Sequence, residues 1–478
     1  MDVHILHTND VHSEFDRYVR LASRLRRVHA QLCAQGERVL CFELGDHIDV
    51  SNPLTNATEG RVNARMIREL PYDGWVFGNN ETLTVDRKVW PDLLQEADTP
   101  LYCSNISVPP LTDHTAALHR RSGDIYRMDG VDVGVFGVTV TYQKLLQTLG
   151  VQSADPAQTA WEIARNLRGR GADIVIMLSH LGLRADQELA DDGLPVDLIV
   201  GGHTHHFLDG GERRGNSWIL QAGKHGHAFG HAVLDVQGGS VRRVTSRLVY
   251  SELKDSPDEA VDSVISAAQR EASAWLEEPV AVVAEHLDHS LLGESELVNL
   301  LCDQLRSEYG SDVAILNGGV ITGGYLAGVI RRRDLLAVCA TPMRPVNMRL
   351  DGMTILRLLA RGFDADLVSR QGFGFGFRGH FVGRLHVSGA DVYTRIRSAG
   401  EGCGRESIET VEIGGEALDK DRIYDVTTSE YVALSPLYAE LQEREFSYGV
   451  PTLRAILERA LTRGDLVNQA RLRRYHAI

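Results

Sequence analysis

The sequence of 478 residues has little cysteine and no long apolar run. No stretch approaches the ~18 consecutive apolar residues that a membrane-spanning helix requires. The cysteines lack the paired spacing of zinc fingers or thioredoxin-like motifs. At this density they are typical of small apolar side chains buried in a protein of a reducing compartment, without a metal or redox role. The six are Cys33, Cys41, Cys103, Cys302, Cys339 and Cys403.

An excess of positive charge is also absent. The chain carries 50 lysines and arginines against 65 acidic residues, a formal net charge of −15. This charge repels polyanions, so we expect neither a nucleic acid polymer nor an anionic membrane as a partner. A small phosphate compound can still bind if a bound metal ion supplies local positive charge.

The opening residues do not have the pattern of a secretory leader. Met1-Asp2-Val3-His4 provides neither a basic segment nor an apolar segment of the kind that a signal peptide has. We therefore expect the protein to be cytoplasmic.

A chain of this length is expected to form two or three domains. Its first half alternates helix-like segments with short apolar runs, a pattern typical of an α/β sheet covered by helices. A hairpin is expected over 126–139, turning near Asp129 and Gly130. Polar clusters follow the ends of the apolar runs, where functional residues of open α/β sheets gather. The runs cover 3–9, 39–46, 75–79, 174–180 and 198–202.

The second half of the chain has a different pattern. A polar stretch at 251–278, helical from Asp258 after a Pro257 start signal, predicts a connector between domains at 1–250 and 279–478. Beyond it we expect an α+β domain. Its helices are predicted at 295–309, at 353–369 and from Pro451, and its strands at 312–316, 384–392 and 408–427.

Histidine, aspartate and asparagine recur at five places that follow the predicted strands. Imidazole and carboxylate together suit divalent first-row metals. Any one of these residues alone is more typical of a structural histidine, a turn or a helix cap. Residues two apart project to one side, so each histidine-containing pair is able to approach one centre. The clusters are Asp10 with His12, Asp46, Asn79, His180, and His203 with His205.

These clusters resemble the signature blocks of the calcineurin-like metallophosphoesterases. More narrowly, they resemble the bacterial 5'-nucleotidase and 2',3'-cyclic phosphodiesterase family, in a subgroup with a Gly-Asn-Asn-Glu block. The resemblance implies an α/β fold, with a β-sandwich flanked by helices and then an α+β 5'-nucleotidase C-terminal domain. The blocks are His7-Thr8-Asn9-Asp10-Val11-His12, Leu44-Gly45-Asp46, Gly78-Asn79-Asn80-Glu81, Ser179-His180-Leu181-Gly182 and Gly202-His203-Thr204-His205.

The resemblance also implies a binuclear metal site. One metal would be bound by Asp10, His12 and His205. The other would be bound by Asn79, His180 and His203, with Asp46 bridging both. Two such cations activate a water and hold the attacking and leaving oxygens of a phosphoryl transfer. Manganese, zinc, iron and cobalt all accept such ligands.

Two positions depart from the family pattern near the predicted metals. Asn80 stands where most relatives have a catalytic histidine, and Leu83 replaces the acid that orients it. An amide donates a hydrogen bond but delivers no proton, so Asn80 is expected to orient the phosphoryl group. His206 or His47 are alternative acids, although each is more typical of a supporting or surface residue.

The C-terminal domain keeps part of the family's substrate site. Asn317, Gly318 and Gly319 match its substrate loop, but Thr322 replaces an arginine. One of two aromatic residues that clamp the base is kept as Tyr431, and the other position is Thr341. The rings of Phe373, Phe375 and Phe377 either replace the missing ring or pack inward from a glycine-rich loop.

The sequence therefore predicts a metal-dependent hydrolase of small phosphate esters, 5'-nucleotidase-like and active in nucleotide catabolism. One alternative keeps the site but cleaves nucleotide sugars, dinucleotides or other small esters. Another is a binding protein that retains metals without turnover.

Overall fold

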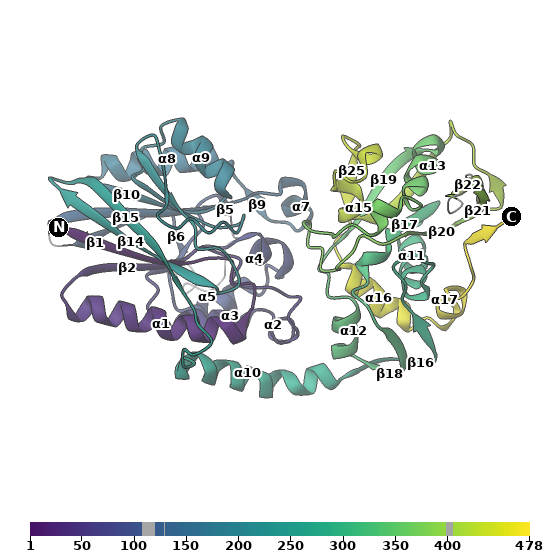
Figure 1. Ribbon diagram of the computed structural model, residues 1–478, viewed down its shortest axis with the longest axis horizontal. Coiled ribbons are helices and arrows are strands. Elements are labelled where there is room, and N and C mark those ends of the chain that lie inside the picture. The colour runs from purple at the N-terminus through teal and green to yellow at the C-terminus, as the bar shows by residue number, and fades with distance from the viewer. Residues whose placement is uncertain (108–119, 129, 398–404) are drawn as a thin grey trace. The chain divides into compact units, whose positions relative to one another are not determined.

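The structure is a computed structural model that describes residues 1–107, 120–128, 130–397 and 405–478. Asp129, at the predicted hairpin turn, and Cys403 lie outside the described residues. The chain forms two compact units, Met1–Ala272 and Ser273–Ile478. Figure 1 colours them from purple to teal and from green to yellow. Helix α10 (Glu259–Glu277) contains the point of division. The predicted bounds of 1–250, 251–278 and 279–478 stay predictions.

Unit 1 is built on two large sheets (Figure 1). The first has the order β15 (Ser240–Tyr250), β14 (Ala228–Gln237), β1 (Asp2–Thr8), β2 (Arg38–Glu43), β3 (Gly74–Trp75), β4 (Leu101–Tyr102) and β6 (Arg120–Arg121). The second has the order β12 (Glu212–Arg214), β13 (Ser217–Leu220), β11 (Leu198–Gly201), β10 (Ile174–His180), β8 (Val131–Thr139) and β7 (Asp124–Met128). β5 (Ile106–Ser107) pairs with β9 (Gln152–Ser153).

The two sheets face each other across one hydrophobic core. Val3 and Phe42 of the first sheet share this core with Val133 and Ile176 of the second. The outward-facing Val175 and Met177 of β10 pack into another core with residues of α8 and α9. Both faces of β10 are therefore buried, which explains why it is a continuous apolar run in the sequence. The predicted α/β sandwich flanked by helices is confirmed.

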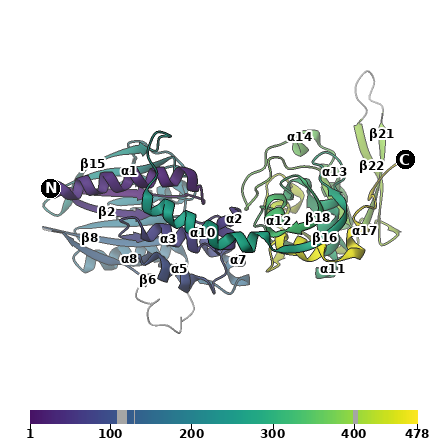
Figure 2. The same ribbon diagram turned by 90° about the horizontal axis from the view of Figure 1, so that it is seen from below.

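The helices of unit 1 lie between consecutive strands. Figure 2 shows the long α1 alongside the first sheet, where it packs against β2 and β14. The helices are α1 (Phe15–Ala34), α2 (Pro53–Ala57), α3 (Arg61–Arg68), α4 (Asn79–Thr84), α5 (Trp90–Ala97), α7 (Gln143–Thr148), α8 (Pro156–Gly169) and α9 (Leu183–Asp191). Among the described residues, no helix is long and apolar enough to span a membrane.

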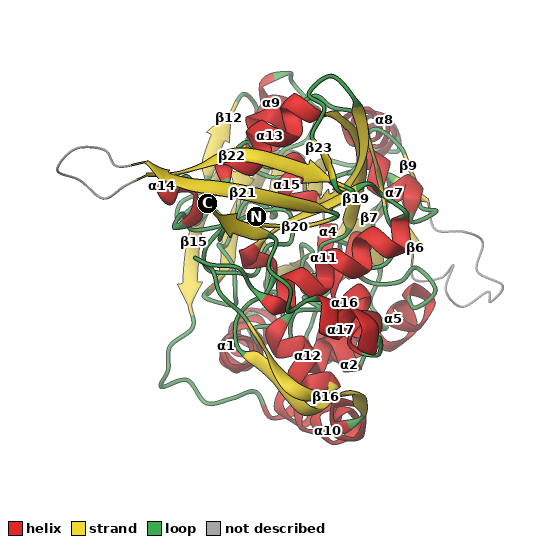
Figure 3. Cartoon of the chain, turned by 90° about the vertical axis from the view of Figure 1, so that its right-hand side faces the viewer, coloured by secondary structure: helices red, strands yellow, loops and turns green. Residues whose placement is uncertain are grey.

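Unit 2 is an α+β domain (Figure 3), and its described residues share one hydrophobic core cluster. One sheet has the order β20 (Leu385–Ser388), β17 (Val313–Asn317), β24 (Ile423–Ser429), β19 (Pro345–Asp351) and β25 (Phe446–Tyr448). Another has the order β23 (Glu416–Ala417), β22 (Arg405–Ile413), β21 (Ala390–Arg397) and β26 (Tyr475–Ala477). β16 (Pro279–Asp288) pairs with β18 (Tyr325–Arg331).

The helices of unit 2 contribute apolar side chains to that core, and α11 is buried over the whole of Leu297–Leu305. They are α11 (Glu296–Tyr309), α12 (Arg332–Val338), α13 (Gly352–Arg361), α14 (Ala365–Val368), α15 (Glu430–Leu434), α16 (Leu453–Leu461) and α17 (Gly464–Gln469). Unit 2 also contains two short 3-10 helices, η1 (Gly318–Val320) and η2 (Ala439–Leu441).

Three predicted elements of unit 2 are divided in the structure. The helix expected at 353–369 ends at Arg361, before Gly362, and α14 follows. The strand expected at 384–392 becomes β20 and β21, separated by Gly389 with φ of 84°. The region 408–427 contains β22, β23 and β24, with the left-handed Gly414 and Gly415 at the first turn. At the second and third breaks, glycine adopts positive φ at little cost, whereas Gly362 keeps a right-handed φ of −64°.

Candidate metal centre

The predicted ligand residues lie at the carboxyl ends of parallel strands in unit 1. β2 runs parallel to β1, and β11 runs parallel to β10. Because parallel strands end at the same edge of a sheet, the loops that follow them meet there. The residues are Asp10 and His12 after β1, Asp46 after β2, Asn79 at the start of α4, His180 at the end of β10, and His203 and His205 after β11.

Five of these residues have a left-handed backbone, which is uncommon outside glycine. Such strain clusters at functional sites, where the surrounding structure enforces it. Their φ values are 54° at Asp10, 49° at His12, 51° at Asp46, 73° at His203 and 61° at His205.

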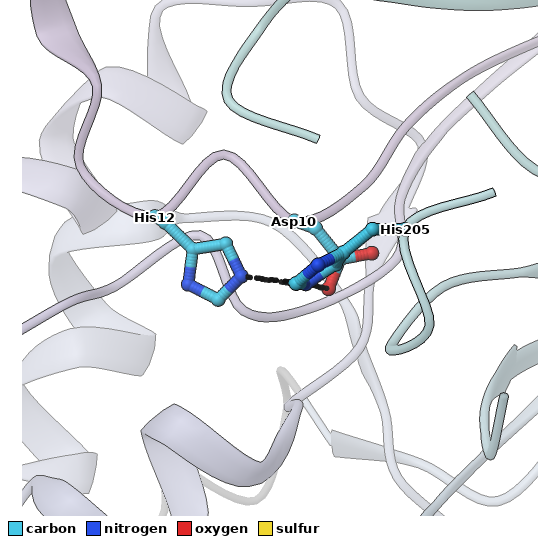
Figure 4. A group of neighbouring side chains, drawn as sticks. All are labelled: Asp10, His12 and His205. Carbon is cyan, nitrogen blue, oxygen red and sulfur yellow. Dashed lines mark hydrogen bonds and ion pairs between the residues drawn. The ribbon is translucent and has the colours of Figure 1, made fainter. Parts of the chain in front are cut away.

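Asp10, His12 and His205 form the first ligand group (Figure 4). The Nε2 atoms of the two histidines lie 3.1 Å apart. Oδ1 of Asp10 lies 3.4 Å from Nε2 of His205 and 3.7 Å from Nε2 of His12. Atoms at these separations can each lie about 2.0 to 2.2 Å from one cation, as histidine and carboxylate ligands do. The three side chains therefore fit a metal ion.

Asp46, His180 and His203 form the second group. Oδ1 of Asp46 lies 3.4 Å from Nε2 of His180, and its Oδ2 lies 3.9 Å from Nε2 of His12 in the first group. One carboxylate thus directs one oxygen toward each group. Residue spacing alone suggested that His203 and His205 approach one centre together. The structure places them in different groups, which is the division that the family resemblance implied.

Asn79 adds an unsatisfied oxygen to this region. Its Oδ1 is buried without a hydrogen-bond partner among the described residues, and so is Nε2 of His180. Buried polar atoms of this kind call for an explanation such as an ion. The preceding Gly78 is required sterically, because a Cβ there would lie 2.2 Å from Oδ1 of Asp46 and 2.7 Å from Nε2 of His180.

The protonation states also suit metal ligands. Burial opposes ionisation of Asp10, yet His205, His180 and His12 hold the pKa of its carboxyl below the usual value. Burial and the charge of His180 lower the pKa of His203 to about 4. His180 differs: burial lowers its pKa, but Asp46 raises it to about 10 overall. His180 therefore carries a proton until a cation replaces it, because metals bind neutral imidazole.

Backbone and side-chain partners fix the ligands in place. The Nδ1 proton of His180 points to the carbonyl oxygen of Leu44 at 2.6 Å, leaving Nε2 for the centre. Asn9 donates to Oδ2 of Asp10 at 2.7 Å and accepts from Ala222 N–H. Such partners orient metal ligands and set their tautomers. Sequence reasoning missed Asn9, although it stands next to Asp10 in the first block.

Glu81 is a second residue that the sequence reasoning missed. Its fully buried carboxylate accepts hydrogen bonds from the backbone N–H groups of Gly78 and Asp46 at 2.8 and 3.0 Å, and from Ile48 at 2.8 Å. It therefore ties the loop after β2 to the start of α4. The signal in the sequence was a glutamate three residues after Gly78, at the position of a capping box.

We predict that Glu81→Ala lowers the free energy of unfolding by at least about 3 kcal/mol, because three buried N–H groups lose their acceptor. Chemical denaturation of the metal-free protein measures this change. The control is Glu188→Ala, which removes an exposed partner of Arg184 and should change stability little. Equal effects of the two variants would contradict the role given to Glu81.

Asn80 lies directly beside a ligand and is buried. Its Nδ2 donates to the carbonyl oxygen of Ile48 at 2.7 Å and lies 3.1 Å from Nδ1 of His12. Asp49, which the sequence reasoning did not single out, lies 3.8 Å from the same Nδ1. The amide therefore contacts His12, and the predicted role of Asn80 on the phosphoryl group stays a prediction.

The two alternative acids have different surroundings. His206 is exposed, and its Nδ1 lies 2.9 Å from the hydroxyl of Thr204. His47 is fully buried, contacts Asn63 and packs edge-on against Tyr18. Burial lowers the pKa of His47 to about 3, so it is neutral near pH 7. His206 is the better placed of the two for reaching a substrate, and its catalytic role stays a prediction.

The predicted substrate residues lie in unit 2. Asn317 ends β17 and donates to Val382 O at 2.7 Å, and Gly318 and Gly319 form η1. The N–H groups of the glycines bond to Arg384 O and Val382 O. The glycines therefore allow the backbone of residues 382–384 to approach their own backbone closely. Their role in binding substrate, like that of Tyr431, stays a prediction.

Comparison with known proteins matches the two units to two family models. The calcineurin-like phosphoesterase model matches residues 3–207, and the model of the 5'-nucleotidase C-terminal domain matches residues 279–435. A curated relative is the uncharacterized metallophosphoesterase YunD of Bacillus subtilis. It is 28% identical over 449 residues, which cover 92% of this chain and 95% of the relative.

Solved structures share the fold. The NAD nucleotidase NadN of Haemophilus influenzae has a TM-score of 0.68 at 16% identity, covering 100% of this chain and 99% of the other. A putative 5'-nucleotidase of Staphylococcus aureus has a TM-score of 0.69 at 16% identity, covering 100% of both chains.

Proposed function

The chain belongs to the 5'-nucleotidase family, with a calcineurin-like metallophosphoesterase domain before a 5'-nucleotidase C-terminal domain, and on this premise we propose that it hydrolyses nucleotides. The observation that carries the proposal is the placement of Asp46. Its two oxygens point to two separate ligand groups, each with two histidines. A carboxylate in that position suits a pair of divalent cations.

The ligand residues would hold the cations as two neighbouring sites. Asp10, His12 and His205 would hold one, and Asn79, His180 and His203 the other, with Asp46 between them. Bound there, manganese, iron, zinc or cobalt would supply an activated water and positive charge for the phosphoryl oxygens. Four neutral imidazoles and an amide limit the negative charge of the site, so an acidic protein can bind an anionic substrate.

The residue at position 80, Asn80, affects which leaving groups the site can expel. An amide engaged with Ile48 and His12 delivers no proton to a ribose hydroxyl. Loss of a general acid costs roughly 100- to 10,000-fold for a poor leaving group. Phosphate is a much better leaving group, so the same site should cleave anhydrides well.

This argument supports a second candidate, a pyrophosphatase of dinucleotides or nucleotide sugars. NadN, which shares the fold, is named as an NAD nucleotidase. His206 could supply a proton in place of Asn80, which would favour monoesters instead.

A substrate panel tests these proposals. The manganese-loaded protein is incubated with nucleoside monophosphates, dinucleotides, nucleotide sugars and sugar phosphates, and each product is quantified. Release of phosphate from monophosphates supports the nucleotidase. Faster cleavage of dinucleotides supports the pyrophosphatase. No hydrolysis of any compound, with metals bound, would identify a binding protein and overturn both.

We also propose a cytoplasmic location. The free cysteines in the described part of the chain support it, because unpaired thiols are typical of reducing compartments.

A further inference from the structure

A groove of about 400 Å³ lies between α1 and the edge strand β15 in unit 1. Its volume is at the lower end of the range of small-molecule sites, which is roughly 300 to 1,000 Å³. Its charged side chains are Arg24 and Arg27 of α1, Arg247 of β15, and Glu252. Three positive charges thus face one negative charge, in a chain whose formal net charge is −15. A local excess of positive charge of this kind attracts an anion.

Two of the three arginines lack a carboxylate that would neutralise them. Among the described residues, neither Arg27 nor Arg247 forms an ion pair. Nη2 of Arg247 lies 3.5 Å from Nδ1 of His231. Burial, followed by the charges of His4 and Arg247, lowers the pKa of His231 to about 4, so this imidazole is neutral near pH 7. The charge of Arg247 is therefore left uncompensated.

Arg24 is held in place at the end of β15. Its Nη1 donates to the carbonyl oxygen of Tyr250 at 2.6 Å and to Oε1 of Glu252 at 3.0 Å. Oε2 of Glu252 also pairs with Nζ of Lys254 at 2.7 Å. The carboxylate of Glu252 thus occupies one arginine of the groove and repels any anion that approaches the other two.

The groove is separate from the candidate metal centre. Helix α1 begins at Phe15, three residues after His12, and rises about 1.5 Å per residue, so Arg27 lies about 18 Å further along its axis. Among the described residues that line the groove, none is a predicted metal ligand. An anion in the groove therefore meets arginines and not the metals.

We propose that this groove is an anion site that binds a phosphoryl group, either as the free ion or on a small molecule. A guanidinium presents parallel N–H groups that match two phosphate oxygens, and Arg27 and Arg247 are both available for such contacts. A phosphate group carries about −1.5 to −2 charges near pH 7, which nearly balances the groove. A single carboxylate leaves it positive, and a neutral compound gains nothing from the charge.

Phosphate binding to the metal-free chain tests the inference. Inorganic phosphate is titrated into wild type, Arg27→Gln and Arg247→Gln with a chelator present, and phosphorus NMR gives the dissociation constants. We expect each variant to bind at least about fivefold more weakly, because it loses charge-assisted hydrogen bonds to the anion. The matched control Arg184→Gln removes the same charge from an exposed pair with Glu188 and should bind like wild type. Equal binding by all four proteins, or no binding by wild type, would overturn the inference.

Glu252→Gln changes the affinity in the opposite direction. The substitution removes the negative charge of the groove and frees Arg24 from its ion pair. We expect phosphate to bind at least about threefold more tightly, because a repulsive charge close to the anion is gone. A variant that only disturbed the fold would not gain affinity. Unchanged or weaker binding by Glu252→Gln would overturn the inference.

A second compound identifies the source of the phosphoryl group. Glycerol 3-phosphate is titrated into the metal-free wild type under the same conditions, with glycerol as the neutral control. Tighter binding than that of inorganic phosphate supports a site for a phosphorylated small molecule. Equal or weaker binding supports a site for the free ion. Binding of glycerol as tight as that of glycerol 3-phosphate would overturn the role of charge and with it the inference.

The inference and the proposed function fail separately. Phosphate binding is measured without metal, so it does not require hydrolysis. Arg27 and Arg247 contact none of the predicted ligands in the described part of the chain, so both variants should keep manganese-dependent hydrolysis. Hydrolysis by a chain whose groove binds no phosphate would overturn the inference alone. Phosphate binding in the groove of a chain that hydrolyses nothing would overturn the proposed function alone.

Discussion

Asp46→Asn is expected to abolish most of the phosphate release by the manganese-loaded protein. The substitution keeps the shape of the side chain but removes its charge and one of its two acceptor oxygens. Because these oxygens point to different ligand groups, the amide can serve one group at most. The expected loss is more than about 100-fold, above the roughly 10- to 100-fold cost of losing an outer-shell partner.

A matched control for this variant is Asp192→Asn. Asp192 is exposed at the end of α9, so its substitution removes the same charge from unit 1 without contact to the ligand groups. It should retain the activity of wild type. Initial rates at several metal concentrations compare the three proteins. Activity of Asp46→Asn at the level of the control would contradict the bridging role.

Metal loading is expected to raise the unfolding temperature of unit 1 by roughly 8 to 16 °C. Metal at 1,000 times its dissociation constant stabilises a protein by about 4 kcal/mol. For a domain of this size, each kcal/mol shifts the midpoint by about 2 to 4 °C. The gain arises because buried Asp46 and Asp10 and the unpartnered oxygen of Asn79 receive a cation.

Differential scanning calorimetry with manganese and with a chelator measures this shift. The shift should be much smaller in Asp46→Asn, because the substitution removes the bridging charge and the amide can serve one ligand group at most. An unchanged midpoint at a metal concentration that gives full hydrolysis would contradict the buried two-cation site.

The strand ends and the residue types around the centre were predictable from the sequence. Apolar runs such as β10 are buried on both faces, and parallel strands bring the following loops to one edge. The division of His203 and His205 between two groups did not follow from their spacing. Both residues have positive φ, so the regular alternation of side chains does not apply to them.

Other features of the structure could not be predicted because they depend on contacts between residues that are far apart in the sequence. The role of Glu81 depends on backbone groups of two separate loops that meet only in the fold. Asn80 is close to His12 although 68 positions separate them. In unit 2, the ring of Phe377 is buried and stacks on the ring of Tyr431, which lies far from it in sequence. Composition alone could not predict that Phe377 packs inward while Phe373 and Phe375 are exposed.

Titration of activity against bound metal tests the central claim most directly. Metal-free protein at known concentration receives increasing manganese, and nucleotide hydrolysis and bound manganese are measured in the same samples. A site with two ligand groups bridged by Asp46 predicts that activity reaches its plateau at two manganese ions per chain. A plateau at one ion per chain, or full activity without metal, would contradict it.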